Sequence, residues 1–148
     1  MKKILVLLIC IYLMIINVNA STDTAYEYIL MDEATGRVLA GKNYNTPALI
    51  ASITKIMTCI LAIESNKLND IVKVTDIVNK SYGSGIYIEK DEEISLRDLL
   101  YGLMLRSGND AALMISEYIG KTTDNFVNEM NKKAKEIGMA NSKFINPS

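Results

Sequence analysis

The stretch PALIASITKIMTCILAIE, residues 47–64, has the composition of a buried helix but carries a lysine near its start. From Ile56 to Ile63 it contains no charged residue, and Lys55 follows Ser52 by three positions. Burying an ammonium group costs free energy unless the group is paired or loses its proton. The position of Lys55 is therefore poor for stability, which indicates a chemical role.

Ser52 and Lys55 can meet because residues three apart on a helix lie on the same face. A serine hydroxyl becomes a good nucleophile when a neighbouring base takes its proton. Burial and the positive end of the helix dipole both favour a neutral lysine that can act as this base. The pattern therefore predicts Ser52 as nucleophile and Lys55 as general base. The alternative is that Ser52 caps the helix while Lys55 extends to solvent.

The absence of histidine from the sequence narrows the possible chemistry. Serine–histidine and cysteine–histidine catalysis within this chain are excluded, as are histidine-ligated metal sites. Cys59 then has no histidine to activate it, and we expect a buried, inert thiol. The formal net charge is −1 with both signs interspersed, which gives no indication of a nucleic-acid surface.

A second polar group interrupts the apolar segment LLYGLMLRSGNDAA, residues 99–112. Ser107 and Asn109 lie where one helical pattern ends and the next begins, and such loops often carry functional side chains. Ser107 could relay a proton, and Asn109 could hydrogen-bond a substrate amide or fix Lys55. Taken alone, the simpler interpretation is a glycine turn in which Asn109 or Asp110 caps the following helix.

The remaining sequence predicts strands first and helices later. A hairpin of strands is expected at 26–31 and 37–41, and shorter strand-like runs lie within 67–78 and at 86–88. Helices are expected at 52–64, 95–106, 110–119 and 123–138. Ser95 and Asp98 form a capping-box pattern at the start of the second helix. The order predicts an α+β fold in which an antiparallel sheet packs with a helical cluster.

Two expected helices carry apolar stripes at helical spacing. The stripe of the second helix consists of Leu96, Leu99, Leu100, Leu103 and Met104. The stripe of the last helix consists of Phe126, Val127, Met130, Ala134 and Ile137.

The N-terminus has the three regions of an export signal. Two lysines precede an uncharged apolar run at 4–16, and a small-residue site ends at Ala20. We therefore expect a signal peptide at 1–20 and an exported domain at 21–148. An uncleaved anchor is the alternative, although the apolar run is short for a bilayer span.

Taken together, the motifs resemble those of a known enzyme family. ASITKIMT (51–58) and DLLYGLMLRSGNDAA (98–112) are similar to the first and second motifs of low-molecular-weight penicillin-binding proteins. More narrowly, they resemble those of serine-type D-alanyl-D-alanine carboxypeptidases. ATGRVLAGKN (34–43) and FVNEMNKKAKEIGMANSKFINPS (126–148) resemble that family in order and spacing. The resemblance implies a β-lactamase/DD-peptidase-like fold.

The resemblance also implies an activity. Enzymes of this family remove the terminal D-alanine from peptidoglycan stem peptides at the outer face of the cytoplasmic membrane. Ser52 would attack the D-Ala-D-Ala carbonyl, its N–H supplying half of the oxyanion hole, and Lys55 would take its proton. Ser107 would relay a proton to the leaving D-alanine, and Asn109 would orient the substrate and Lys55. β-Lactams would acylate the same serine, without any metal or organic cofactor.

The sequence departs from the family in having no Lys-Thr-Gly, the third motif. In the family this motif lies on a later strand, binds the substrate carboxylate and helps to complete the oxyanion hole. We therefore expect an N-terminal portion of a carboxypeptidase, truncated before the later sheet strands and the family's membrane anchor. Activity of the isolated chain should be weak or absent, since losing oxyanion donors costs about two to three orders of magnitude. Exposed apolar helix faces are also expected.

Three alternatives stay open at this point. A class A-like β-lactamase would need a deacylating glutamate, for which Glu117 and Glu129 are candidates, although both are expected on helix surfaces. An exported, non-catalytic fragment that binds peptidoglycan or a partner chain would be consistent with the missing third motif. An esterase of the same fold is the third.

Overall fold

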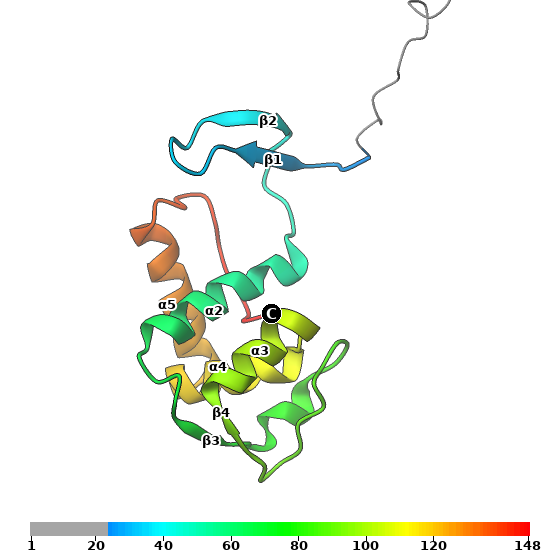
Figure 1. Ribbon diagram of the computed structural model, residues 1–148, viewed down its shortest axis with the longest axis vertical. Coiled ribbons are helices and arrows are strands. Elements are labelled where there is room, and N and C mark those ends of the chain that lie inside the picture. The colour runs from blue at the N-terminus through cyan, green and yellow to red at the C-terminus, as the bar shows by residue number, and fades with distance from the viewer. Residues whose placement is uncertain (1–23) are drawn as a thin grey trace, which may run out of the picture. The chain divides into compact units, whose positions relative to one another are not determined.

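The computed structural model describes residues 24–148, and the predicted signal peptide at 1–20 lies outside them (Figure 1). The chain divides after Thr46 into two compact units. Within the described residues, no helix has both the length and the apolar composition that a bilayer crossing requires.

The first unit contains the predicted hairpin. Strands β1 (Tyr28–Met31) and β2 (Val38–Lys42) pair in an antiparallel arrangement. Between them, the Asp32 carboxylate accepts hydrogen bonds from the backbone N–H and the hydroxyl of Thr35, at 2.9 and 2.5 Å. Gly36 adopts φ +68, a left-handed conformation in which a side chain is disfavoured. The turn predicted at DEATG, residues 32–36, therefore connects the two strands of the hairpin as expected.

The second unit, residues 47–148, is a cluster of helices with a short strand pair (Figure 1). Its helices are α2 (Thr54–Glu64), α3 (Leu96–Arg106), α4 (Asn109–Gly120) and α5 (Thr123–Glu136). Helix α2 contacts each of the other three. The strands β3 (Ile71–Lys73) and β4 (Glu93–Ser95) are antiparallel, and two 3₁₀ turns, η1 (Ala51–Ile53) and η2 (Asp76–Lys80), complete the unit.

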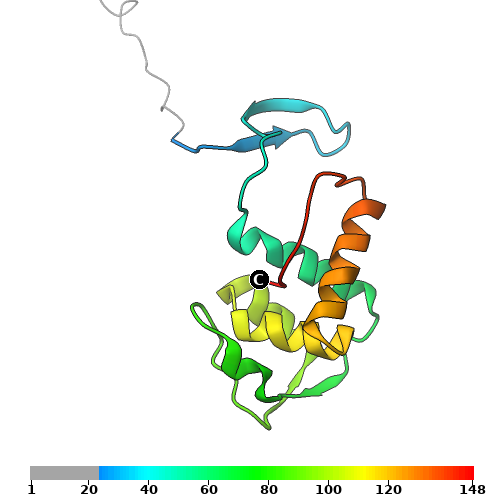
Figure 2. The ribbon, with the colours of Figure 1, turned by 180° about the vertical axis from the view of Figure 1, so that it is seen from behind.

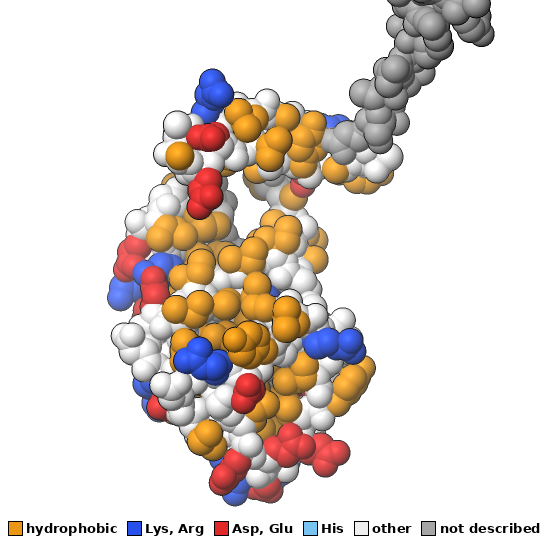
Figure 3. Space-filling model, in the orientation of Figure 1, with side chains coloured by type: hydrophobic (Ala, Val, Ile, Leu, Met, Phe, Trp, Pro, Cys, Tyr) orange, Lys and Arg blue, Asp and Glu red, His pale blue; other side chains and the backbone are white. Residues whose placement is uncertain are grey.

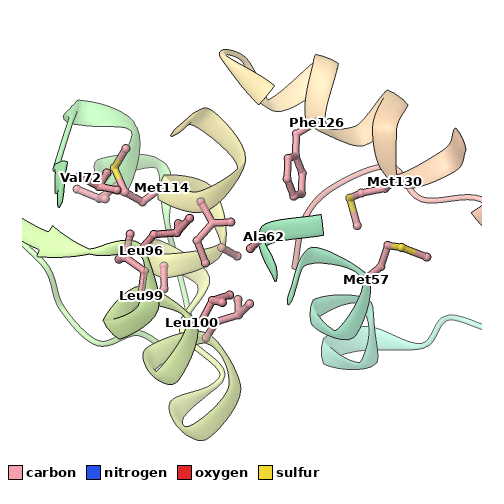
Figure 4. Packing of buried hydrophobic residues seen from close by; sticks show 14 of the residues in the cluster. Met57, Ala62, Val72, Leu96, Leu99, Leu100, Met114, Phe126 and Met130 are labelled. Atoms are coloured by element: carbon pink, nitrogen blue, oxygen red, sulfur yellow. The ribbon is translucent and has the colours of Figure 1, made fainter. Parts of the chain in front are cut away.

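The core of this unit is formed by one face of each helix (Figure 4). The predicted stripes supply Leu96, Leu99 and Leu103 from α3 and Phe126, Met130 and Ala134 from α5, all at most 1% exposed. Full burial of a leucine or phenylalanine side chain contributes about 1.5–3 kcal/mol to stability. Each stripe reaches the surface at its C-terminal residue. Met104 is 46% exposed, and Ile137, beyond the end of α5, is 53% exposed.

The start of α3 confirms Ser95 as the helix cap, and Asp98 binds its hydroxyl instead of its backbone N–H. The Ser95 hydroxyl accepts a hydrogen bond from the Asp98 N–H at 3.0 Å and donates one to the Asp98 carboxylate at 2.6 Å. Thr122 caps α5 in the same way, accepting from the Asn125 N–H at 3.1 Å. These side chains satisfy backbone donors that have no partner within the helix.

The chain beyond α5 folds back toward α2 (Figure 2). The Asn131 side chain holds both the N–H and the carbonyl of Phe144, at 2.9 and 2.8 Å. Further along, the Pro147 carbonyl accepts a hydrogen bond from the fully buried Thr58 hydroxyl at 2.7 Å. Residues distant in sequence therefore cover the face of α2 on which Thr58 lies.

Three details of the expected secondary structure were wrong, although the α+β class is confirmed. The helix expected from Ser52 begins as the 3₁₀ turn η1 and is α-helical only from Thr54. Residues 86–88 are not a strand, because their N–H groups bind a side chain. The described strands also form two separate two-stranded sheets, whereas a single sheet was expected.

Apolar side chains gather on the outer surface over α2 and α3 (Figure 3). The largest exposed ones on these helices are Ile56, Ile63, Tyr101, Met104 and Leu105, each at least 46% exposed. The expectation of exposed apolar helix faces is therefore confirmed for this unit.

Candidate active site

Ser52 lies in the turn η1, immediately before α2, and its side chain is exposed. The preceding residue, Ala51, adopts φ +47, a left-handed conformation that costs a non-glycine residue on the order of 1 kcal/mol. The turn is closed by a hydrogen bond from the Ile53 N–H to the Ile50 carbonyl at 3.1 Å. No side-chain cap is formed at the start of α2, so Ser52 does not have the capping role considered as an alternative.

Lys55 lies one turn further along and points inward, with only 3% of its surface exposed. Its Nζ is 3.1 Å from Ser52 Oγ, within hydrogen-bonding distance. Burial lowers the pKa of the Lys55 ammonium below its ordinary value. Among residues 24–148, no carboxylate forms an ion pair with Lys55 that would oppose this effect. The alternative in which Lys55 reaches solvent does not fit its burial.

Ser107 completes a three-residue cluster. It is the C-cap of α3, where φ +53 turns the chain into the left-handed region that usually favours glycine. The Gly108 N–H then bonds to the Gly102 carbonyl at 3.2 Å, which closes the end of the helix. In this position Ser107 Oγ donates to Ser52 Oγ at 3.0 Å. The nucleophile candidate is thus contacted by the lysine on one side and a second serine on another.

Asn109 is placed differently from what was expected. Its Nδ2 donates to the Tyr82 carbonyl at 2.7 Å, and its backbone N–H donates to the Ser84 carbonyl at 2.8 Å. Within the described part of the chain, no hydrogen bond joins Asn109 to Lys55. The N-cap of α4 is Gly108, so Asn109 is the first helical residue and not its cap. Asn109 therefore ties the loop at 82–84 to the start of α4.

Asp110 is a buried residue that sequence reasoning considered only as a helix cap. It is 5% exposed, and its carboxylate accepts hydrogen bonds from the N–H groups of Ile86, Tyr87 and Ile88 at 2.6–3.4 Å. It also accepts from the Ala111 N–H at 2.8 Å. The only feature of the sequence that could have indicated this role is an acidic residue at the start of an apolar helix. The residues around Asp110 in the sequence gave no indication of its contact with residues 86–88.

The remaining candidates lie outside the cluster. Glu117 accepts a hydrogen bond from Thr75, and Glu129 pairs with Lys132 at the surface of α5. Cys59 is partly buried, and burial raises the pKa of its thiol, which favours the unreactive protonated form. Within the described residues, no group of three His, Cys, Asp or Glu side chains is arranged to hold a metal ion. Of the candidate catalytic residues, the structure brings together Ser52, Lys55 and Ser107.

The comparisons with known proteins agree on one family. A family model described as D-alanyl-D-alanine carboxypeptidase matches residues 15–148. D-alanyl-D-alanine carboxypeptidase DacF of Bacillus subtilis is 39% identical over 125 residues, which cover 81% of this chain and 32% of that protein.

Solved structures give the same result. The carboxypeptidase DacD of Francisella tularensis superposes with a TM-score of 0.80 at 36% identity, covering 85% of this chain and 32% of its own. Penicillin binding protein 5 of Haemophilus influenzae gives a TM-score of 0.79 at 29% identity, covering 88% and 40%. This chain thus spans less than half the length of each of these proteins.

Proposed function

Because this chain belongs to the D-alanyl-D-alanine carboxypeptidase family, we propose that it uses Ser52 as the nucleophile of a serine-type DD-peptidase. The substrate would be a peptidoglycan stem peptide ending in D-Ala-D-Ala, and β-lactams would acylate the same serine. One observation carries the assignment. Ser52 Oγ is 3.1 Å from the Nζ of a lysine that is 3% exposed, and 3.0 Å from Ser107 Oγ.

The first chemical step is attack of Ser52 Oγ on the carbonyl carbon of the scissile peptide bond. Lys55 Nζ, in its neutral form, takes the hydroxyl proton as the new C–O bond forms. The lowered pKa supports this role because a larger fraction of the amine is neutral near pH 7 than for an exposed lysine. The Ser52 backbone N–H is proposed as one donor to the oxyanion that develops on the carbonyl oxygen.

The second step breaks the C–N bond and releases D-alanine. Ser107 Oγ gives its proton to the leaving nitrogen, and the proton that Lys55 took from Ser52 then restores the Ser107 hydroxyl. The contact between Ser107 Oγ and Ser52 Oγ supports this role, because Ser52 Oγ is bonded at this step to the carbon that carries the leaving nitrogen. Water then attacks the acyl-enzyme, the same groups remove its proton, and Ser52 regains its hydroxyl. The proposed role of Asn109 is to orient the substrate with its side-chain amide, in addition to holding the loop at 82–84.

The place of action follows from the substrate. Peptidoglycan stem peptides lie outside the cytoplasmic membrane, so the proposal includes export of the chain by the predicted signal peptide at 1–20. The carboxypeptidase assignment is favoured over a β-lactamase because Glu117 and Glu129, the candidates for a deacylating base, bond elsewhere.

The test is covalent labelling. The purified protein is incubated with benzylpenicillin, its intact mass is measured, and any adduct is mapped by peptide digestion. We expect an adduct to form slowly on Ser52, in line with the weak activity expected without the third motif, and the Ser52→Ala variant should lack it. Ser142→Ala, at an exposed serine outside the cluster, is the matched control and should label like the wild type. A folded wild-type protein that binds ligand without any adduct would favour a non-catalytic binding role, and rapid turnover of the adduct would favour a β-lactamase.

A further inference from the structure

The loop at 82–88 is fastened to the start of α4 at several points. Asn109 holds the carbonyls of Tyr82 and Ser84, and the next residue, Asp110, holds the N–H groups of 86–88. Both residues follow directly after the turn that carries Ser107. The loop is thus connected to the catalytic cluster through two consecutive residues.

The contact between Asp110 and the loop is that of an anion in a backbone nest. Successive N–H groups converge on one carboxylate, the shortest hydrogen bond being from Tyr87 at 2.6 Å. Tyr87 adopts φ +60, which is uncommon for a tyrosine. A Cβ atom added to Gly85 would lie 3.0 Å from the Asp110 carboxylate, so the loop backbone approaches this side chain closely. Hydrogen bonds to a charged acceptor are among the stronger ones in proteins.

The same carboxylate also lies close to the turn that carries Ser107. A Cβ atom added to Gly108 would lie 3.0 Å from Asp110 Oδ1. Ser107 itself is in the left-handed conformation, which a serine keeps only when its surroundings hold it there. One buried side chain therefore binds the loop and lies close to the residue next to Ser107.

We propose that Asp110 is a positioning residue that clamps the loop at 82–88 to the Ser107–Asn109 turn and thereby holds Ser107 Oγ against Ser52. The inference rests on the proposed function, because Ser107 acts there as the proton relay. Asp110 acts through the backbone of the turn and does not itself contact the reacting atoms.

The variant that tests this is Asp110→Asn, which keeps the size of the side chain but replaces one acceptor oxygen by a donor facing the loop N–H groups. Asp98→Asn is the matched control, since Asp98 accepts a hydrogen bond at the opposite end of α3. Acylation of Ser52 by benzylpenicillin is timed by intact mass, at a temperature where circular dichroism shows each variant to be folded. We expect Asp110→Asn to slow acylation roughly 10- to 100-fold, since a misplacement of about 1 Å costs up to this much. Asp98→Asn should acylate like the wild type.

A purely structural role would lower the melting temperature of Asp110→Asn but leave the acylation rate of the folded variant unchanged, and that result would overturn the proposal. If Asp110→Asn does not fold, Gly85→Ala takes its place, because its Cβ displaces the same carboxylate while leaving the charge in place. Slower acylation by folded Gly85→Ala supports the clamp, and an unchanged rate rejects it.

A second measurement separates this proposal from the proposed function. Backbone amide resonances of residues 86–88, Ser107 and Gly108 are compared between the wild type and the variant by NMR. We expect Asp110→Asn to shift the resonances of the loop and of the Ser107 turn together. If folded wild-type protein never acylates, the proposed function fails, and the clamp is judged by these resonances alone. A shift confined to residues 86–88, with Ser107 and Gly108 unchanged, would reject the clamp.

Discussion

Replacing Lys55 by methionine should make the protein more stable and catalytically silent. The lysine nitrogen is buried with one hydrogen bond, to Ser52, and without an ion pair among the described residues. Burying a polar group without full compensation costs about 1–3 kcal/mol. The single hydrogen bond of the lysine nitrogen contributes about 0.5–1.5 kcal/mol to stability and offsets only part of this cost. Methionine fills a similar linear space without this cost, so Lys55→Met should raise the free energy of unfolding by about 1 kcal/mol. That corresponds to a melting temperature about 4 °C higher.

The stabilisation should depend on pH in a defined direction. Because the pKa of Lys55 is lower in the folded than in the unfolded protein, the unfolded chain binds more protons between the two values. Wild-type stability therefore rises with pH through that window. The advantage of Lys55→Met should be largest below the folded-state pKa of Lys55 and should shrink toward the ordinary lysine value of 10.5.

Urea unfolding followed by circular dichroism, at several pH values, measures this difference. Lys132→Met is the matched control, since Lys132 has 67% of its side chain exposed and should show neither the stabilisation nor its pH dependence. Acylation by benzylpenicillin should fall by at least about 100-fold in Lys55→Met, which removes the proposed general base. The reasoning that burial of the Lys55 amine costs stability would be refuted by either of two results. One is a Lys55→Met protein that is less stable than the wild type, and the other is a gain in stability over the wild type that grows with pH.

Three further predictions concern the same unit. The rate of acylation of Ser52 should rise with pH and level off below the ordinary pKa range of lysine, because burial lowers the pKa of Lys55; a pH–rate profile that follows an unshifted lysine would contradict this. Ser107→Gly should stabilise the protein by about 1 kcal/mol, since glycine suits its φ of +53, yet should slow acylation about 100-fold, as should Ser107→Ala without the stabilisation. Leu99→Ala should lower the free energy of unfolding by about 2–5 kcal/mol, whereas Leu105→Ala, 76% exposed, should change it by less than about 0.5 kcal/mol.

The parts of the site that the sequence predicted depend on short sequence separations. Ser52 and Lys55 are three residues apart, and helical geometry alone indicates that their side chains can meet. The helix cap at Ser95 and the buried stripe of α3 follow from local rules of the same kind. Contacts between residues so close in sequence can be predicted because the backbone between the two partners can adopt few conformations.

The parts that were missed depend on contacts between distant residues. The alternating apolar residues at 86–88 suggested a strand. In the structure, the N–H groups of these residues instead donate hydrogen bonds to the carboxylate of Asp110, 22 to 24 positions away. Asn109 was expected near Lys55 but bonds to Tyr82, 27 positions earlier. Met104 fits the spacing of the apolar stripe of α3, but 46% of its surface is exposed. No local rule specifies which loop a helix end will meet.

The hydrogen bond between Thr58 and the Pro147 carbonyl has a consequence for the order in which the contacts of α2 form. Thr58 follows Lys55 by three positions on the same face of α2, and its partner lies 89 positions later in the chain. Closing a loop of this length costs more chain entropy than closing the single turns of a helix. We therefore expect helix α2 to form before this contact, so that the side of α2 on which Thr58 lies is covered late in folding.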